Sequence, residues 1–150
     1  MSKTVLTLAR ATETLMQQAY TILRERFTET SDPYAVLSRI ALEEQHHDEL
    51  LAELEPLFSA TELPSRTELA FLEVQVALIG KLIAVCQRVQ EGCPPREAIE
   101  EMRALELAVF EDVLPRLHLK IGDELDAVSK LRTETALHHE LLDQLLELAP

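Results

Sequence analysis

Apolar residues recur every three or four positions along most of the chain, which is the spacing of side chains that share one face of an α-helix. No stretch alternates apolar and polar residues convincingly enough to predict a strand. The periodic segments predict helices over about residues 3–28, 33–54, 65–90, 96–119 and 123–148. The expected fold class is therefore all-α.

Capping residues and a few prolines and glycines mark the ends of these helices. Ser31-Asp32-Pro33 combines a side-chain cap with a proline in the first turn. Ser65 and Glu68 have the spacing of a capping box, in which each side chain accepts a hydrogen bond from the backbone amide of the other residue. The remaining expected breaks are Gly92 with the two prolines after it, a bend at Pro115, and a cap at Gly122 and Asp123.

The third predicted helix differs from the others because apolar residues cover most of its circumference. Glu73, Lys81 and Arg88 leave only a narrow polar strip. Such a helix needs cover on two sides, from the bundle and from another segment or another chain. Its length suits a crossover that returns the chain along a bundle, and its apolar surface is a candidate interface for a homodimer.

Composition and charge narrow the class of protein. A length of 150 residues suits one domain spanning residues 1–150, and 47% hydrophobic residues are enough to form a core. The 27 acidic and 14 basic residues leave a net charge of −13, which argues against nucleic-acid partners and anionic membrane surfaces. No uncharged apolar stretch reaches the roughly 18 residues of a membrane span. Without an export signal or a cysteine motif, a cytoplasmic location with reduced thiols is expected.

Two of the predicted helices carry a histidine pair in similar surroundings. In the second helix Glu44 precedes His47 by three residues, which places both side chains on one helix face, with His47 near the middle of the apolar side. Thr135 and His138 have the same spacing in the fifth helix. The other histidine of each pair points about 100° away and is expected at the surface.

The helices that precede these two segments each place a carboxylate among apolar neighbours. Glu13 lies 31 residues before Glu44, and Glu106 lies 29 residues before Thr135. Two similar helix hairpins would bring each glutamate level with the motif that follows it. Any one of these residues alone is more often a solvated carboxylate or a hydrogen-bonded core histidine. Buried carboxylates that occur together need cations or donors, so the joint pattern indicates a metal site.

This arrangement resembles the ferritin-like superfamily, and within it the rubrerythrin-like di-iron carboxylate domains. The resemblance rests on ATETLMQQAY (11–20), IALEEQHH (40–47), MRALELAVFEDVL (102–114) and TALHH (135–139), and it covers nearly the whole chain. It implies a ferritin-like four-helix bundle built from two helix hairpins joined by the apolar crossover helix. It also implies a metal site with the ligands Glu13, Glu44, His47, Glu106 and His138.

The chain departs from the family pattern at one ligand, since Thr135 stands where the second bridging glutamate is expected. Three carboxylates leave a charge of +1 beside two divalent ions and −1 beside one, so an asymmetric two-metal site and a single-metal site both stay open. The paired CxxC motifs of rubredoxin-type iron are absent as well. A mixed histidine and carboxylate set suits Fe, with Mn or Zn as alternatives, rather than Ca or Mg.

With iron, the resemblance implies an oxidoreductase of the rubrerythrin peroxidase or ferroxidase type, which reacts with peroxide or dioxygen. In that arrangement Glu44 bridges, the two histidines close the ends of the site, and Glu13 and Glu106 hold the outer positions. The alternative is a non-enzymatic interaction module that dimerises through the third helix and retains a vestigial metal site. Iron storage in a large shell is less favoured, because no assembly surface is identified in the sequence.

Overall fold

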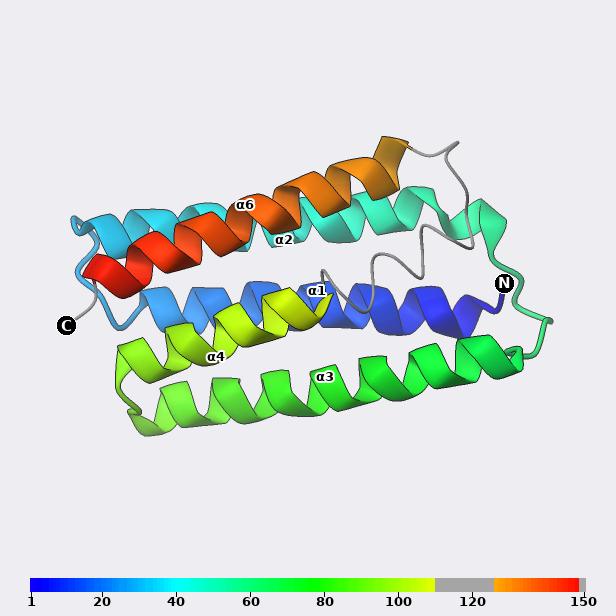
Figure 1. Ribbon diagram of the computed structural model, residues 1–150, viewed down its shortest axis with the longest axis horizontal. Helices are drawn as coiled ribbons and strands as arrows, with labels where there is room; N and C mark the ends of the chain where they lie inside the picture. Colours follow the sequence, from blue (N-terminus) through cyan, green and yellow to red (C-terminus); the bar gives the residue numbers. More distant parts are fainter. Residues whose placement is uncertain (110–125, 149–150) are drawn as a thin grey trace.

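The computed structural model describes residues 1–109 and 126–148, which are helical and include no β-strand (Figure 1). The elements are α1 (Lys3–Arg24), α2 (Asp32–Glu53), a short 3-10 helix (Glu55–Leu57), α3 (Arg66–Glu91), α4 (Pro95–Ala108) and α6 (Asp126–Leu148). The prediction of an all-α fold is confirmed. The predicted bend at Pro115 and the cap at Gly122 and Asp123 lie outside the described residues.

The side-chain caps predicted for α2 and α3 are confirmed. Ser31 caps α2 by accepting a hydrogen bond from the Tyr34 amide, with a proline in the first turn. In α3 the Glu68 amide donates to Ser65 Oγ, and Glu68 Oε2 accepts from the Ser65 amide at 2.9 Å, which completes the capping box. Glu68 Oε1 accepts from the backbone amide of Ser2 at 2.9 Å. The same carboxylate therefore ties the start of α1 to the start of α3.

Two helix ends show why the chain turns where it does. α3 ends at Gly92, whose φ of 96° lies in the left-handed region that glycine adopts at little cost. α1 ends at Arg24, before the end at about residue 28 that the apolar period predicts. The amides of Arg26 and Phe27 each donate to a carbonyl three residues back, at 3.0 Å. The last turn therefore tightens into the connection to α2 instead of extending the helix.

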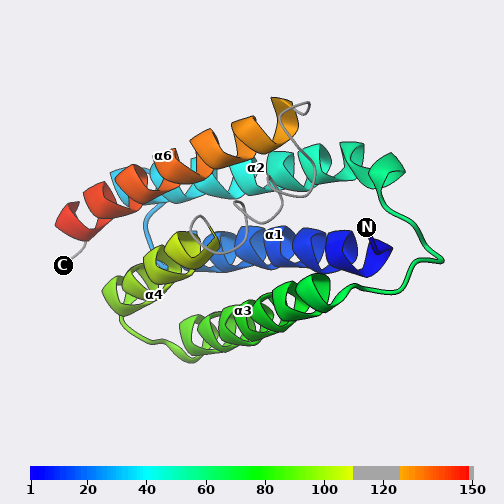
Figure 2. The same ribbon diagram turned by 45° about the vertical axis from the view of Figure 1, so that its right-hand side comes forward.

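The helices lie side by side along a common long direction (Figures 1 and 2). α1 packs against α2 and α3, α2 also packs against α6, and α4 packs against both α3 and α6. Apolar side chains at helical spacing fill the space between them, and the largest fully buried ones include Met16, Tyr20, Leu37, Ile99 and Leu142. The four helices that carry the predicted ligands thus share one core.

α3 lies at the outside of this arrangement, against α1 and α4 (Figure 1). Its inner residues are buried, but Leu69, Val76 and Ile83 expose 50%, 58% and 44% of their surface. Within the described part of the chain this apolar helix is therefore covered on one side and not on two. Among the described residues, α3 is also the one helix that is long and apolar enough to cross a membrane, by length and composition alone.

Candidate metal centre

Four helices bring the five predicted ligands together inside the core. α1 supplies Glu13, α2 supplies Glu44 and His47, α4 supplies Glu106 and α6 supplies His138. None of these residues exposes more than 7% of its surface. Burying three carboxylates and two imidazoles is unfavourable unless each polar atom finds a partner or a cation. The contacts of these atoms therefore decide what the cluster can do.

Glu44 lies at the centre of the cluster, between the two histidines. Its Oε2 lies 3.2 Å from Nδ1 of His47, which is three residues further along the same helix face. Its Oε1 lies 3.0 Å from Nδ1 of His138 on α6. The two imidazole rings stack with their centroids 5.2 Å apart. One ligand atom from each of these three residues lies within 4.8 Å of the other two, close enough to surround a metal ion.

Glu13 and Glu106 extend the cluster on opposite sides. Glu13 Oε2 lies 3.4 Å from His47 Nδ1, and Glu106 Oε1 lies 3.3 Å from His138 Nδ1. Each Nδ1 atom therefore faces two carboxylates, one from Glu44 and one from the helix that precedes it in the same hairpin. The result is two similar half-sites, Glu13 with His47 and Glu106 with His138, which share Glu44.

Two carboxylates that sequence reasoning missed hold the far side of each imidazole. Glu43 Oε2 accepts a hydrogen bond from His138 Nε2 at 2.8 Å, and Glu134 Oε2 lies 3.0 Å from His47 Nε2. Each glutamate lies four residues before the histidine of its own helix but contacts the histidine of the other hairpin. Such contacts orient an imidazole and leave the opposite nitrogen to a metal. The sequence shows these two glutamates in a common spacing, Glu-x-x-x-His, in both α2 and α6.

Two further buried groups, a tyrosine and a threonine, differ in what they contribute to the cluster. The Tyr20 hydroxyl on α1 donates to Glu106 Oε1 at 2.7 Å, so it links α1 to α4 across the core. Thr135, which replaces the expected bridging glutamate, is also buried. Its hydroxyl donates to the Leu131 carbonyl at 2.8 Å. Thr135 therefore satisfies its hydroxyl within α6 and offers the cluster no charge.

The three central carboxylates differ in protonation. Burial, and then the charge of Glu44, raise the pKa of Glu13 to about 8. The same two causes raise the pKa of Glu106 to about 6. Burial also acts to raise the pKa of Glu44, but its close contacts with His138 and His47 lower that pKa well below its usual value. At neutral pH Glu44 and Glu106 are therefore ionised, whereas Glu13 carries a proton.

Both imidazoles are held as cations in the metal-free cluster. Burial acts to lower the pKa of His47, but hydrogen bonds to Glu13 and Glu44 raise it to about 10. Burial likewise opposes the charge on His138, but close contacts with Glu106, Glu43 and Glu44 raise its pKa to about 12. Protons on the histidines and on Glu13 thus offset the charge of the buried carboxylates. A metal ion that bound here would displace these protons.

The polar atoms of the cluster fit a transition-metal ion. Glu44 Oε1, which faces Nδ1 of His138 at 3.0 Å, is buried without a hydrogen-bond partner among the described residues. A metal ion bound between the two residues would satisfy this oxygen. Carboxylate oxygens and imidazole nitrogens gathered in one place are the donor set of Fe, Mn and Zn. The donors present therefore match the ions that the sequence predicts.

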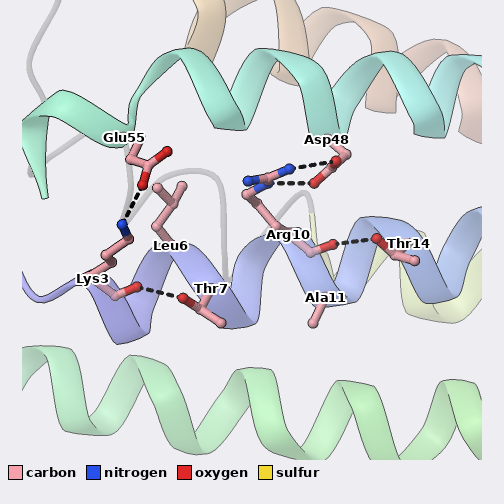
Figure 3. Close-up of a pocket in the computed structure, with 8 residues that line it drawn as sticks. All are labelled: Lys3, Leu6, Thr7, Arg10, Ala11, Thr14, Asp48 and Glu55. Atoms are coloured by element: carbon pink, nitrogen blue, oxygen red, sulfur yellow. Dashed lines mark hydrogen bonds and ion pairs between the residues drawn. The ribbon is translucent and has the colours of Figure 1, made fainter. Parts of the chain in front are cut away.

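A second group of charged residues lies at the surface between α1 and α2 (Figure 3). Arg10 donates to Asp48 through two hydrogen bonds, of 2.7 and 2.9 Å, and Lys3 pairs with Glu55. The charged groups drawn in this depression thus satisfy one another. They give no reason to place a ligand there, and the core cluster stays the candidate site.

Comparison with known proteins does not identify the chain. No family model, curated protein or solved structure matches it. The geometry and charge of the cluster formed by α1, α2, α4 and α6 are therefore the basis for inferring a function.

Proposed function

We propose that this chain is a ferritin-like protein of the rubrerythrin type, which binds transition-metal ions at the buried cluster. The observation that carries the proposal is the convergence of three buried carboxylates and two buried histidines, from four helices, around Glu44. An apolar core tolerates such a group of charges only with compensation. In a ferritin-like arrangement α1 with α2, and α4 with α6, are the two hairpins of the bundle, and α3 is the crossover.

The two half-sites would hold up to two ions, and Glu44 would be a ligand available to both. Each half-site supplies one histidine Nδ1 and one outer glutamate, and both share Glu44. Because Thr135 replaces the second bridge, only three carboxylates contact the Nδ1 atoms, and they leave one positive charge beside two divalent ions. Glu43 and Glu134 contribute further negative charge behind the imidazoles. We expect the first ion to bind more tightly than the second.

Iron is the ion that would give this site a reaction. Bound iron would supply redox chemistry toward peroxide or dioxygen, as in an oxidoreductase of the peroxidase or ferroxidase type. The chain's own residues would hold the ligands in position. Glu43 orients His138 through the hydrogen bond at Nε2, Glu134 lies 3.0 Å from Nε2 of His47, and Tyr20 orients Glu106. The apolar core around these residues excludes water from them.

Metal retention after loading tests the proposal. The protein is incubated anaerobically with Fe(II), Mn(II) or Zn(II) and desalted, and its metal content is measured by inductively coupled plasma mass spectrometry. We expect about one to two ions per chain in the wild type. Glu44→Ala and His47→Ala should lose them. His46→Ala is the matched control, because its side chain is adjacent on the same helix but 52% exposed.

Each outcome of this experiment either supports or contradicts metal binding at the cluster. Loss of metal in the two site variants with retention in His46→Ala supports the site, provided that circular dichroism shows unchanged helicity. Equal retention by all variants, or no retention by the wild type, contradicts the proposal. If iron is retained, peroxide consumption by the Fe(II) protein distinguishes an oxidoreductase from a site that only holds metal.

A further inference from the structure

One side of α3 carries an apolar seam that the described residues of the chain cover only in part, since two of its members pack against the core and three are about half exposed. Its six members are Leu69, Leu72, Val76, Ile79, Ile83 and Cys86. Three of them are about half exposed, and the other three are half-buried. Successive members are separated by alternating steps of three and four residues, which is the spacing of the a and d positions of a coiled coil. We call this set the outer seam.

The inner face of α3 has the same spacing and has partners within the chain. Its members are Phe71, Gln75, Leu78, Leu82, Val85 and Val89, which are buried on the side that packs against α1 and α4. A helix with two such seams is suited to packing on two sides. α3 lies at the edge of the molecule (Figures 1 and 2), and within the described chain its second seam stays partly exposed.

Gly80 lies beside the outer seam, in the middle of α3, and its own chain gives no reason for a glycine there. Glycine weakens the interior of a helix relative to alanine. A Cβ atom at this position would meet no atom of the described residues within 4 Å, so α3 does not need the glycine to approach α1 or α4. The missing side chain would instead let a second helix approach the outer seam closely.

Charge favours a second copy of this chain as the partner. α3 carries three basic and three acidic residues and is therefore neutral, although the whole chain carries −13. The rest of the protein is accordingly acidic, and two copies that meet elsewhere bring like charges together. Two copies that meet at α3 therefore bring less like charge into close contact than copies that meet elsewhere. The net charge also opposes docking on an anionic membrane.

We propose that two copies of this chain form a symmetric dimer in which their outer seams pack antiparallel. The register that fills both seams places Val76 against Ile79 of the second copy, Leu72 against Ile83, and Leu69 against Cys86. Every a position then faces a d position, and each contact occurs twice, so the interface closes by two-fold symmetry.

The antiparallel direction also suits the charges along α3. In this register the two Glu73 residues are offset by about nine residues, or about 13 Å along the helix axis. A parallel pairing without an offset would place the two Glu73 residues side by side. Antiparallel packing also sets the two helix dipoles against each other favourably. The direction of pairing is therefore part of the proposal and can be tested separately.

Molar mass measured by light scattering tests the dimer. At about 100 μM chain we expect the wild type at twice the 17.0 kDa of one chain. Val76→Glu places a charge in the seam and should raise the dissociation constant at least about 100-fold. Ala70→Glu is the matched control, because it adds the same charge to an exposed position of α3 outside the seam. Gly80→Leu should favour the helix while weakening the dimer, so a loss of folding cannot mimic this result.

Mixed variants test the register. Val76→Glu chains mixed with Ile79→Lys chains should form a heterodimer, because the two positions face each other across the antiparallel seam. Val76→Glu mixed with Val76→Lys should not do so, since these positions face each other only in a parallel pairing. Circular dichroism of each variant alone confirms that it is folded.

Several results would overturn the proposal. They are a wild type that stays at the mass of one chain, a Val76→Glu variant that dimerises as the wild type does, and preferential pairing of Val76→Glu with Val76→Lys. Binding of monomeric wild type to phosphatidylcholine vesicles, abolished by Val76→Glu, would assign the outer seam to a membrane instead. All of these are read from mass or flotation, so they do not depend on metal binding.

Discussion

Replacing Tyr20 by phenylalanine removes one hydroxyl and leaves the rest of the buried ring in place. That hydroxyl donates to Glu106 Oε1 at 2.7 Å, and the two residues are 0% and 1% exposed, so bulk water cannot replace the lost bond. A hydrogen bond to a charged group contributes about 1.5–3 kcal/mol to stability. Each kcal/mol lowers the melting temperature of a domain of this size by about 2–4 °C. We therefore expect Tyr20→Phe to lower it by about 3–12 °C.

The loss should depend on pH, because Glu106 titrates close to neutrality. Burial and the charge of Glu44 raise its pKa to about 6. Above that pH the Tyr20 hydroxyl donates to a carboxylate. Below it the bond is made with a neutral acid and contributes only about 0.5–1.5 kcal/mol. Since the hydroxyl favours the ionised form, the destabilisation by Tyr20→Phe should grow as the pH rises through about 6.

Urea unfolding of the metal-free protein, at about pH 5 and about pH 8, measures both effects. Tyr34→Phe is the control, since Tyr34 is half-buried and no described residue accepts a hydrogen bond from its hydroxyl. Glu106→Gln completes a double-mutant cycle. The reasoning is refuted if Tyr20→Phe costs less than about 0.5 kcal/mol at both pH values, or costs the same in the Glu106→Gln background.

Three further changes test other parts of the structure. Thr135→Glu supplies the missing carboxylate, so it should strengthen binding of the second ion and bring the metal content to about two ions per chain, while it destabilises the metal-free protein. Second-ion affinity equal to that of the wild type would count against the bridging position. Because the pKa values of His47 and His138 are about 10 and 12, metal binding should strengthen as pH rises and release protons. Calorimetry in buffers of different ionisation enthalpy measures that release, and a heat independent of the buffer would contradict the ligand assignment. Gly92→Ala adds a Cβ atom to a residue whose φ of 96° suits glycine, so it should lower the free energy of unfolding by about 1–2 kcal/mol. Gly92→Asn should lower it by less, and urea unfolding measures both.

The helices of this protein were predictable from local signals. The capping box at Ser65 and the proline-containing start of α2 bring donors and acceptors together within a few residues, so their effect does not depend on distant contacts. The inward direction of Glu44 and His47 was predictable for the same reason, because helical spacing alone places both on the apolar face. The end of α1 was less predictable, since its apolar period continues past Arg24 although the chain turns there.

The contacts between hairpins were not predictable in the same way. Glu43 and Glu134 each lie on the side of the motif that an isolated helix would expose, yet both contact a histidine of the other hairpin. The bond from Tyr20 to Glu106 likewise joins residues that are 86 positions apart. Spacing along a helix defines which residues share a face. It does not define how two faces are rotated and shifted against each other, because side-chain packing between helices sets that arrangement.

The sequence by itself determined that the chain is all-α, where most of its described helices begin, and which side of each helix is apolar, because these properties depend on periodicity and caps within a few residues. Only the tertiary structure decided that Glu44 lies between two histidines, that their protonation is set by carboxylates from several helices, and that Leu69, Val76 and Ile83 of α3 stay exposed in the described chain. These features depend on distances between helices, and packing of the whole core is what sets such distances.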